Sequence, residues 1–308
     1  MPNDAMKANP LLCNPETGIC EVPHLGDEGL TSLEVQMHVK PVKVIYFTDP
    51  ICSTCWGIEP QLRKLKLEYG NSIEIEYRMG GLLPDWSYNS GGISKPSDVA
   101  HHWDEVSAYY DMPIDGDIWL EDPLASSYPP SIAFKAAQAQ DHEKSILFLR
   151  VIREMVFMEK KNITKWEHLA AAAKNAGLDV EKLMEDYHGK AIADFQADLK
   201  IAQAYGVRGF PSLFFEADHR EREFVYGAKP YANYEIAILK LHSGAVKAVY
   251  HKDWEALFGQ YPSLTIREFT ELSGMPGNNA EQLLNDLVLK GSLQKLTTKN
   301  GCLWKLKV

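Results

Sequence analysis

The chemistry that this sequence can perform is indicated most directly by two cysteines, Cys52 and Cys55, with two residues between them. They follow an apolar run and precede a segment rich in helix-forming residues, which places them at the start of a predicted helix. At a helix start, the unpaired N–H groups and the helix dipole favour a thiolate on the first cysteine. The second lies about one turn further on, so the two sulfurs can form a disulfide and release a bound partner. The spacing predicts a redox-active pair in which Cys52 is the exposed nucleophile and Cys55 the resolving thiol.

Such a pair could instead bind a metal ion, or its two thiols could be unreactive. Cys13 and Cys20 could supply two more ligands, but no second Cys-x-x-Cys or Cys-x-x-His spacing completes a four-ligand set, so we expect no metal. Between Cys13 and Cys20, Asn-Pro and Thr-Gly favour a turn. These two thiols could therefore form a disulfide and act as an accessory redox pair, hold one edge of a metal site, or be unreactive. The fifth cysteine, Cys302, is expected to be a small buried side chain.

The cysteine pair needs a strand and a helix to position it, and the surrounding sequence predicts both. The run 42–47 is β-branched and aromatic and lies between prolines, which predicts a buried strand. Helix formers follow in 51–69, with apolar residues at spacings of three and four and with Pro60 implying a kink. The alternating run 73–77 predicts a second strand. Strand, helix and strand in this order begin an α/β fold.

Helical patterns replace strand patterns from about 97 to 205. Strand character returns at 212–215 and at 223–226, and a helical pattern follows at 231–241. A sheet interrupted by so long a helical stretch predicts an insertion into one domain, and not a second independent core. We therefore expect an α/β domain over 41–245 that carries a helical insertion.

The segments on either side of this domain have a different character. Residues 1–40 form a polar leader with frequent proline and glycine, which argues against a long helix or strand. Residues 246–308 contain a connecting segment, two short helical stretches and two strand patterns that flank Asn300 and Gly301, a strong hairpin signal. A helix–turn–helix followed by a hairpin resembles a winged-helix domain. We therefore expect a small C-terminal winged-helix-like domain.

Two motifs together indicate a family. The stretch from Asp49 to Trp56 and the stretch from Gly206 to Ser212 resemble motifs of the DsbA family in the thioredoxin superfamily, and most of all its FrnE-like branch. The resemblance covers about the same residues as the α/β domain. It implies a thioredoxin-like fold with a helical insertion, and disulfide exchange on protein substrates without a cofactor. It also implies that Pro211 is a cis-proline beside the cysteines, that Phe210 contacts the substrate, and that Trp56 helps to shape the peptide groove.

Two departures from the family pattern refine this expectation. The dipeptide between the cysteines is Ser-Thr, without the histidine that helps to hold the thiolate in strongly oxidising members. We therefore expect only a moderately lowered pKa for Cys52 and a reducing-to-intermediate potential. Many relatives also carry a buried acid in the preceding strand, where this sequence has Tyr46. Glu59, four residues after Cys55, is expected either to accept the proton of Cys55 or to be a solvated carboxylate.

Charge and composition limit the classes of partner that the chain is expected to bind. The chain has 32 basic and 42 acidic residues, a formal net charge of −10, which disfavours nucleic acid and anionic membranes as partners. Residues 262–308 hold six basic and four acidic residues, and the would-be recognition stretch 279–289 holds no Lys or Arg, so we expect this part to contact protein. Neither a targeting segment nor an apolar run of the roughly 18–20 residues that span a bilayer is found, so the cytoplasm is the expected location.

The main prediction is a thiol–disulfide oxidoreductase that acts on protein or peptide disulfides through Cys52 and Cys55. Two other functions fit the resemblance. Some DsbA-like proteins with a C-terminal extension are non-catalytic adaptors that present a regulator to a protease, and in them the groove would be a docking surface and the thiols dispensable. Glutathione-dependent isomerases or transferases of the kappa type share the inserted fold, but typically have serine at the position of Cys52.

Overall fold

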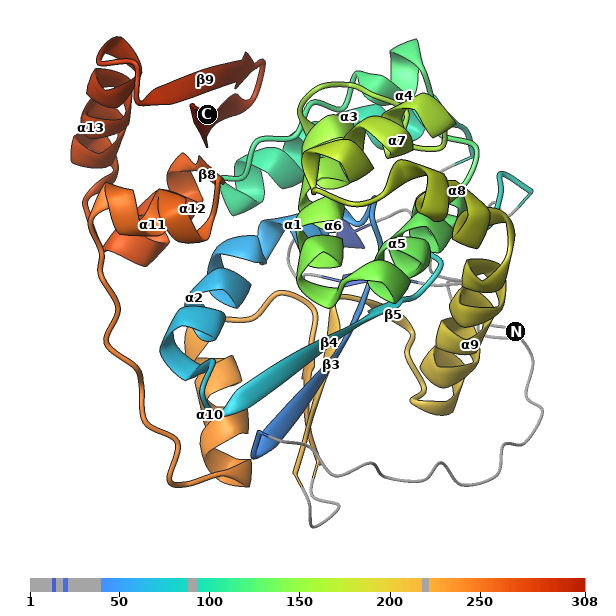
Figure 1. Cartoon of the computed structure of the whole chain (residues 1–308), viewed down its shortest axis with the longest axis horizontal. Coiled ribbons are helices and arrows are strands. Elements are labelled where there is room, and N and C mark those ends of the chain that lie inside the picture. The colour runs from blue at the N-terminus through green and yellow to red at the C-terminus, as the bar shows by residue number, and fades with distance from the viewer. Residues whose placement is uncertain (1–12, 15–18, 22–39, 88–93, 218–221, 308) are drawn as a thin grey trace, which may run out of the picture.

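The computed structural model describes residues 13–14, 19–21, 40–87, 94–217 and 222–307, and in the first two ranges it describes the backbone alone. At its centre is a four-stranded mixed sheet in the order β4-β3-β6-β7 (Figure 1). The strands are β3 (Val42–Thr48), β4 (Ile73–Met79), β6 (Ser212–Glu216) and β7 (Arg222–Tyr226). β3 and β4 are parallel, whereas β6 is antiparallel to β3 and to β7.

The central strand β3 is buried on both faces, and Lys43 is the one residue of β3 that is partly exposed. A strand that is covered on both faces has a nearly continuous apolar sequence, and for this reason β3 is well predicted from the sequence. Phe47 lies opposite Ser212 in the β3–β6 register. The residues that follow β3 and those that precede β6 therefore meet at one end of the sheet, and that end carries the cysteine pair.

The single helix expected over 51–69 is two helices, α1 (Ser53–Gly57) and α2 (Glu59–Tyr69). The break lies at Ile58, and Pro60 is in the first turn of α2. A proline at that position loses no intrahelical hydrogen bond, because its missing N–H has no helical partner there. The expected kink within one helix is thus a junction between two.

The expected helical insertion lies between β4 and β5 (Gly209–Phe210), and its helix α9 runs alongside β4 (Figure 1). After β7, α10 (Tyr231–Leu241) packs beside α2 and against β6 and β7. The helices of the insertion are α3 (Pro96–Tyr110), α4 (Ile118–Glu121), α5 (Tyr128–Gln140), α6 (His142–Phe157), α7 (Trp166–Asn175), α8 (Val180–His188) and α9 (Lys190–Ala204).

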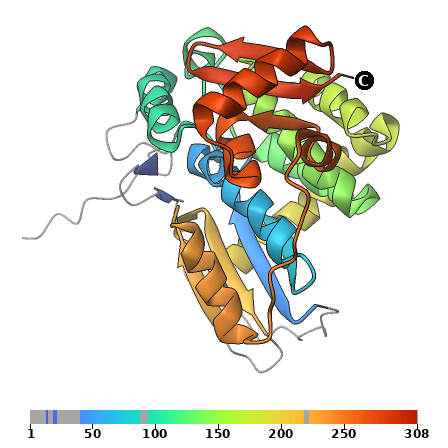
Figure 2. The same ribbon diagram turned by 90° about the vertical axis from the view of Figure 1, so that its left-hand side faces the viewer.

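A second, small sheet joins the N-terminal segment to the residues that precede Pro211. Its antiparallel strands, in the order β1-β2-β5, are β1 (Cys13–Asn14), β2 (Ile19–Glu21) and β5. In the turned view, β1 and β2 lie near the end of the central sheet at which β6 begins (Figure 2). The rest of the polar leader lies outside the described residues.

A small C-terminal unit of helices and strands has its own cluster of buried apolar side chains, as expected (Figure 2). Its sheet has the order β8-β10-β9. The sequence pattern missed α11, and it missed β8 because three residues that are all buried show no alternation. The elements are α11 (Trp254–Gln260), β8 (Ser263–Thr265), α12 (Ile266–Ser273), α13 (Gly277–Leu289), β9 (Leu293–Thr298) and β10 (Gly301–Leu306).

The tip of the β9–β10 hairpin packs on the helical insertion. Gly301 pairs with Thr298, so the turn is made by Lys299 and Asn300, one residue earlier than the sequence predicts. The ammonium of Lys299 lies 2.8 Å from a carboxylate oxygen of Asp104. The side-chain amide of Asn300 donates to the same carboxylate at 2.7 Å. The hairpin tip is therefore occupied by contacts within the chain.

Candidate functional site

The cysteine pair lies where the sequence predicts it, between the end of β3 and the start of α1. Cys52 is the N-cap of α1, and its Sγ accepts a hydrogen bond from the backbone N–H of Cys55 at 3.2 Å. This arrangement uses an N–H group that the first turn of a helix leaves without an intrahelical partner. The two thiols are therefore held close together at the end of the central sheet.

Cys52 is not the exposed nucleophile that the spacing predicts. Its side chain has no exposed surface, and neither has that of Cys55. Burial raises the pKa of Cys52 well above the usual thiol value, since a thiolate in an apolar interior loses its hydration. The expected moderate lowering of this pKa is therefore wrong. The helix-start position favours the thiolate, but complete burial outweighs it.

Cys55 is the thiol whose thiolate the surroundings favour. Burial alone would raise its pKa, but a hydrogen bond from Cys52, the charge of Arg153 and hydrogen bonds from Thr48 and Tyr46 together lower it. Tyr46 stands in the strand where relatives carry a buried acid, and it is buried here. No pattern in the sequence connects the cysteine pair with Arg153, which comes from α6.

Arg153 is fully buried and connects the cysteine pair with α2. Its guanidinium donates to the hydroxyl of Thr48 at 2.6 Å and to a carboxylate oxygen of Glu59 at 2.5 Å. Burial would raise the pKa of Glu59, but the charges of Arg153 and Arg63 lower it. The side chain of Glu59 is 13% exposed. Glu59 is therefore an ion-pair partner of arginines, and not the solvated carboxylate that was one of the two expectations.

Asp49 is a buried carboxyl group that the sequence analysis did not single out. It accepts hydrogen bonds from the N–H of Ile51 at 3.0 Å, the N–H of Leu82 at 2.8 Å and the hydroxyl of Ser127 at 2.8 Å. These bonds tie the turn before Cys52 to the loop after β4 and to the start of α5. Burial raises the pKa of Asp49 to about 6, although its hydrogen bonds oppose this.

This raised pKa predicts a pH dependence of stability. Between the ordinary carboxyl pKa of 3.8 and about 6, the folded chain binds a proton at Asp49 that the unfolded chain has released. The contribution of Asp49 to stability is thus fully present below pH 3.8 and is lost as the pH rises through about 6. We expect the free energy of unfolding of the wild type, minus that of Asp49→Asn, to fall by about 2 kcal/mol between pH 4.5 and pH 7 in urea titrations. A difference that is constant with pH would contradict this.

Phe210 and Pro211 lie at the same end of the sheet as the cysteines. The peptide bond between them is cis. The ring of Phe210 is buried against Gly80, so closely that a Cβ at Gly80 would overlap the ring. The backbone of Phe210, and not its side chain, is therefore the part that can face a peptide, and it pairs with β2.

Gly80→Ala tests this close approach. We expect a loss of about 1–3 kcal/mol in the free energy of unfolding, because the ring of Phe210 must move to admit the methyl group. Gly259→Ala in α11 is the matched control, since a Cβ there meets nothing within 4 Å. In urea titrations this control should be neutral or stabilising. Equal effects of the two substitutions would contradict the packing described.

Trp56 was expected in the peptide groove, but it lies in the core and has no exposed surface. Its indole N–H donates to the carbonyl of Pro113 at 3.1 Å. Its ring stacks on Phe157 at a centroid distance of 5.5 Å, and the guanidinium of Arg150 lies 4.3 Å from the ring centroid. Trp56 therefore fixes α1 against the insertion and does not contact a ligand. The residues of α1 from Ser53 to Trp56 are all buried, which explains the difference.

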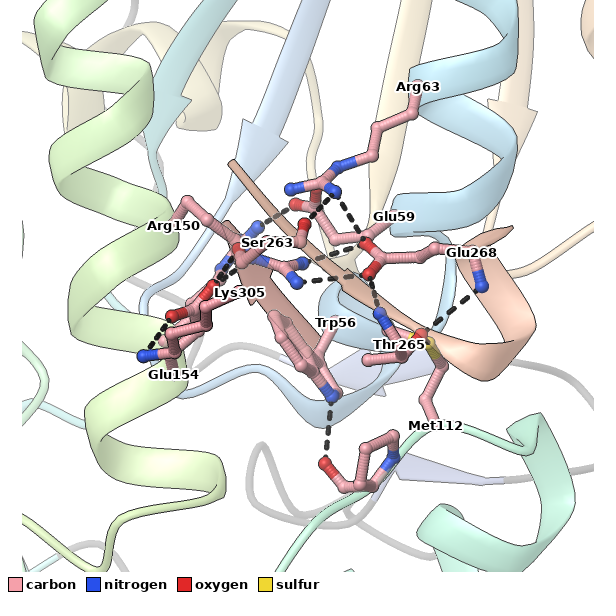
Figure 3. A network of polar contacts seen from close by, with 12 residues as sticks. Trp56, Glu59, Arg63, Met112, Arg150, Glu154, Ser263, Thr265, Glu268 and Lys305 are labelled. Atoms are coloured by element: carbon pink, nitrogen blue, oxygen red, sulfur yellow. Dashed lines mark hydrogen bonds and ion pairs between the residues drawn. The ribbon is translucent and has the colours of Figure 1, made fainter. Parts of the chain in front are cut away.

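A buried ion-pair cluster extends from this region into the C-terminal unit (Figure 3). The guanidinium of Arg150 donates to both carboxylate oxygens of Glu268, at 2.8 and 3.0 Å, and to Glu154 at 2.7 Å. Arg63 lies 3.3 Å from Glu268, and Lys305 lies 2.9 Å from Glu154. Because α2 and α6 supply one side and α12 and β10 the other, the cluster anchors the C-terminal unit to the main fold.

The remaining cysteines are placed less fully. The backbones of Cys13 and Cys20 lie opposite each other in β1 and β2, but their side chains are outside what the structure describes. Cys302 is partly exposed, and not buried as expected, and its Sγ lies 3.7 Å from the hydroxyl of Thr297 on the neighbouring strand β9. Within the described residues, no group of three or more His, Cys, Asp or Glu side chains is arranged to hold a metal ion.

Comparison with known proteins identifies the family. The sequence model of a family described as Thioredoxin matches residues 46–236. The chain belongs to the thioredoxin family. The cytosolic disulfide reductase DsbM from Pseudomonas aeruginosa has a similar structure, with a TM-score of 0.54 and 20% sequence identity over 66% of this chain and 100% of DsbM. At that identity the likeness concerns the thioredoxin fold alone.

Curated relatives of this thioredoxin-family chain match over a greater length. It is 33% identical over 299 residues to a protein named ClpXP adapter protein SpxH in Halalkalibacterium halodurans, covering 95% of this chain and 96% of the relative. A protein of the same name in Shouchella clausii is 32% identical over 298 residues, with the same coverage. The one in Bacillus subtilis is 29% identical over 271 residues, covering 86% of this chain and 89% of the relative.

The two site residues that sequence reasoning missed differ in how they could have been found. Asp49 lies inside the motif of the family, but a carboxylate before a proline is also common in exposed turns. Arg153 carried a readable signal, since it lies four residues after Leu149 and four before Phe157, on the apolar face of its helix. A charged residue at such a spacing indicates a buried ion pair. The pattern does not show that its partners lie in β3 and α2.

Proposed function

We propose that this protein is an adaptor that presents a partner protein to the ClpXP protease. The observation that carries the proposal is the length of the similarity to proteins named ClpXP adapter protein SpxH, which reaches 95% of this chain. The disulfide reductase DsbM is matched over 66% of this chain and over all of DsbM, so a substantial part of this chain is additional to such an enzyme. The adaptor alternative therefore accounts for the whole chain better than the oxidoreductase does.

Two features of the structure support this proposal. Cys52 has no exposed surface, so the site does not offer the free nucleophile that attack on a substrate disulfide needs. The ion pairs from Arg150 to Glu268 and from Lys305 to Glu154 fix the C-terminal unit against the helical insertion. A partner that contacts both parts would therefore meet a preformed surface and lose little freedom in ordering it.

The test of the proposal is the turnover of proteins in cells. In a strain that lacks this protein, we expect at least one protein to have a longer half-life, and the same protein to be stabilised when ClpXP is inactivated. The full-length double variant Cys52→Ser/Cys55→Ser is expected to restore its turnover. If pulse labelling with proteome-wide mass spectrometry finds no protein stabilised in both strains, the adaptor function is wrong.

A second candidate function is thiol–disulfide exchange on protein or peptide disulfides through Cys52 and Cys55, without a cofactor. One specific observation favours it. The pair is intact at the start of α1, and the surroundings of Cys55, including Arg153, favour its thiolate. In this function, a peptide strand would pair with the backbone of Phe210, beside Pro211, in the place that β2 occupies in this structure. A movement that exposes Cys52 is then required.

We also propose finer assignments for the main fold and the C-terminal unit. The FrnE-like branch is supported by the motif around the cysteines, and the domain division near residue 245 by the separate apolar cluster beyond it. A winged-helix-like character of the C-terminal unit is supported by α12 and α13 followed by the β9–β10 hairpin. Protein is favoured over nucleic acid as its partner, because the hairpin tip already contacts Asp104 through Lys299 and Asn300.

Among the helices of the described residues, none has both the length and the apolar character needed to cross a membrane. We propose the cytoplasm as the location of the protein. The proposal rests on the adaptor function, since the protein must meet the protease that its relatives are named for.

A further inference from the structure

The N-terminal segment lies against the strand that precedes Pro211. In the small sheet β1-β2-β5, Cys13 lies opposite Cys20, and Cys20 lies opposite Phe210. Three residues from distant parts of the chain thus form one row across the strands. Residues that lie directly opposite each other in antiparallel strands project to the same face of a sheet. The register therefore aligns Cys13, Cys20 and Phe210 along one direction.

This row lies at the end of the central sheet that carries the Cys52–Cys55 pair. Ser212, two residues after Phe210, pairs with Phe47 near the end of β3. The N–H of Gly80, whose Cα lies against the ring of Phe210, donates to the carbonyl of Thr48 at 2.8 Å. From Thr48 the chain runs through a short turn to Cys52. β5 and the β2 strand paired with it are therefore at the same end of the central sheet as the thiols.

The spacing of β1 and β2 suits a disulfide. Residues opposite each other in an antiparallel pair have Cα atoms about 4.5 or 5.5 Å apart. Disulfides span Cα separations of about 4.4–6.8 Å. Because Cys13 and Cys20 are such a pair, a bond between them needs no movement of the strands.

We propose that Cys13 and Cys20 form a disulfide between β1 and β2, and that this disulfide exchanges with the Cys52/Cys55 dithiol. The paired strands β1 and β2, here called the N-terminal hairpin, are then a substrate carried within the chain. The proposal rests on the second candidate function, the reactivity of the Cys52/Cys55 pair, and is independent of the adaptor function. The row of Cys13, Cys20 and Phe210 carries it. Cys52 has no exposed surface, which hinders attack on a protein arriving from solvent, whereas β2 belongs to the same chain and pairs with β5 at the end of the sheet that carries Cys52.

The exchange balances within the chain. The thiolate of Cys52 attacks Sγ of Cys20, the Cys13–Cys20 bond breaks, and Cys13 leaves as a thiolate that takes up a proton. The thiolate of Cys55 then attacks Sγ of Cys52 and releases Cys20 in the same way. Two electrons have moved from Cys52 and Cys55 to the hairpin, whose cysteines are reduced while the site is oxidised. The first disulfide of the chain is supplied by a small-molecule disulfide such as oxidised glutathione, which is itself reduced.

The direct test traps the mixed disulfide in the full chain. In a Cys302→Ser background, Cys13→Ser/Cys55→Ser keeps Cys20 and Cys52 and removes both thiols that could resolve the bond between them. After incubation with oxidised glutathione, acid quenching, alkylation and digestion, mass spectrometry should find a Cys20–Cys52 disulfide in most chains. The matched control Cys20→Ser/Cys55→Ser keeps Cys13, which is one strand further from β5, and should give about tenfold less Cys13–Cys52 disulfide.

The outcomes distinguish failure of the proposed exchange with Cys20 from failure of the reactivity of the Cys52/Cys55 pair. If Cys52 carries glutathione but forms no bond to Cys20, or if the two double variants give equal yields, the inference is wrong while the reactivity of the site stands. If Cys52 is not modified at all in variants whose circular dichroism matches the wild type, both are wrong.

A second measurement uses the wild-type chain and so does not depend on the variants folding. With one equivalent of oxidised glutathione per chain, the disulfide should distribute between Cys13–Cys20 and Cys52–Cys55. The rate of its redistribution should be independent of protein concentration, as expected for an exchange within one chain. A rate that rises in proportion to concentration would overturn the inference, since the exchange would then run between chains.

Discussion

Glu268→Ala is expected to lower the free energy of unfolding by about 3–5 kcal/mol, the largest loss among the substitutions considered for the C-terminal unit. Glu268 is fully buried and accepts two hydrogen bonds from Arg150. It also accepts one from the backbone N–H of Thr265 at 2.8 Å, at the start of α12. Its removal leaves the guanidinium of Arg150 buried with less compensation and removes the cap of a helix. Urea unfolding monitored by tryptophan fluorescence measures the change.

Two further variants make this test specific to the buried charge. Arg267→Ala removes a partly exposed ion pair with Glu271 from the same helix and is expected to cost less than about 1 kcal/mol. Arg150→Met/Glu268→Leu removes both charges of this pair and is expected to be more stable than Glu268→Ala, because no uncompensated ion remains at position 150 and Glu154 keeps Lys305 as a partner. If Glu268→Ala and Arg267→Ala had similar effects, the cluster would not be what anchors the C-terminal unit.

Arg153→Met is expected to raise the pKa of Cys55. The charge of the guanidinium is among the causes that lower this pKa against the effect of burial, and the hydroxyl of Thr48 that bonds to Cys55 is itself held by Arg153. The substitution should also reduce the free energy of unfolding by about 3 kcal/mol, because the buried carboxylate of Glu59 loses a partner. The pKa is measured from the pH dependence of alkylation at Cys55, followed by mass spectrometry of the reduced protein.

Arg153→Lys is the matched control for the pKa. It keeps a positive charge but loses the fork of donors that reaches Thr48 and Glu59 together, so it should preserve most of the lowered pKa while still costing stability. An unchanged alkylation profile in Arg153→Met would show that the charge of Arg153 does not act on Cys55. The same shift in both variants would assign the effect to hydrogen bonding alone.

Most of the fold follows from local patterns in the sequence. The run that forms β3 is apolar on both faces, and the helices α3 to α9 occupy the stretch from about 97 to 205 in which the sequence predicts helices. The errors have local causes. The three residues of β8 are too few to show a period, and Pro60 marks the first turn of α2 as readily as a kink. Such features depend on what packs against them, which a pattern does not contain.

The site was predicted less completely than the fold. The motifs located Cys52, Cys55 and Pro211, because their spacing and order along the chain are distinctive. Exposure and ionisation were predicted wrongly, since they depend on residues that the fold brings in from elsewhere. The pKa of Cys52 is raised by burial, whereas that of Cys55 is lowered by a hydrogen bond from Cys52 together with the charge of Arg153, which comes from α6, about a hundred residues after Cys55. Electrostatic partners of this kind follow from tertiary packing and not from spacing.

Because Cys52 is buried, replacing both thiols by serine distinguishes a docking site from a catalytic site. If the site is a scaffold for docking, its thiols contribute packing and hydrogen bonds, which serine largely replaces at each position. If the site is catalytic, the loss of both sulfur atoms abolishes the activity, because thiolate attack has no substitute among hydroxyl groups at neutral pH. The two functions therefore give opposite results with the same variant.

The most direct measurement of the central claim is degradation of the partner protein, once it is identified by its turnover in cells, by purified ClpXP with the full-length protein added. We expect the wild type to accelerate degradation and Cys52→Ser/Cys55→Ser to accelerate it to the same extent. No acceleration by the wild type, or its loss in the double variant with the fold intact, would contradict the adaptor function.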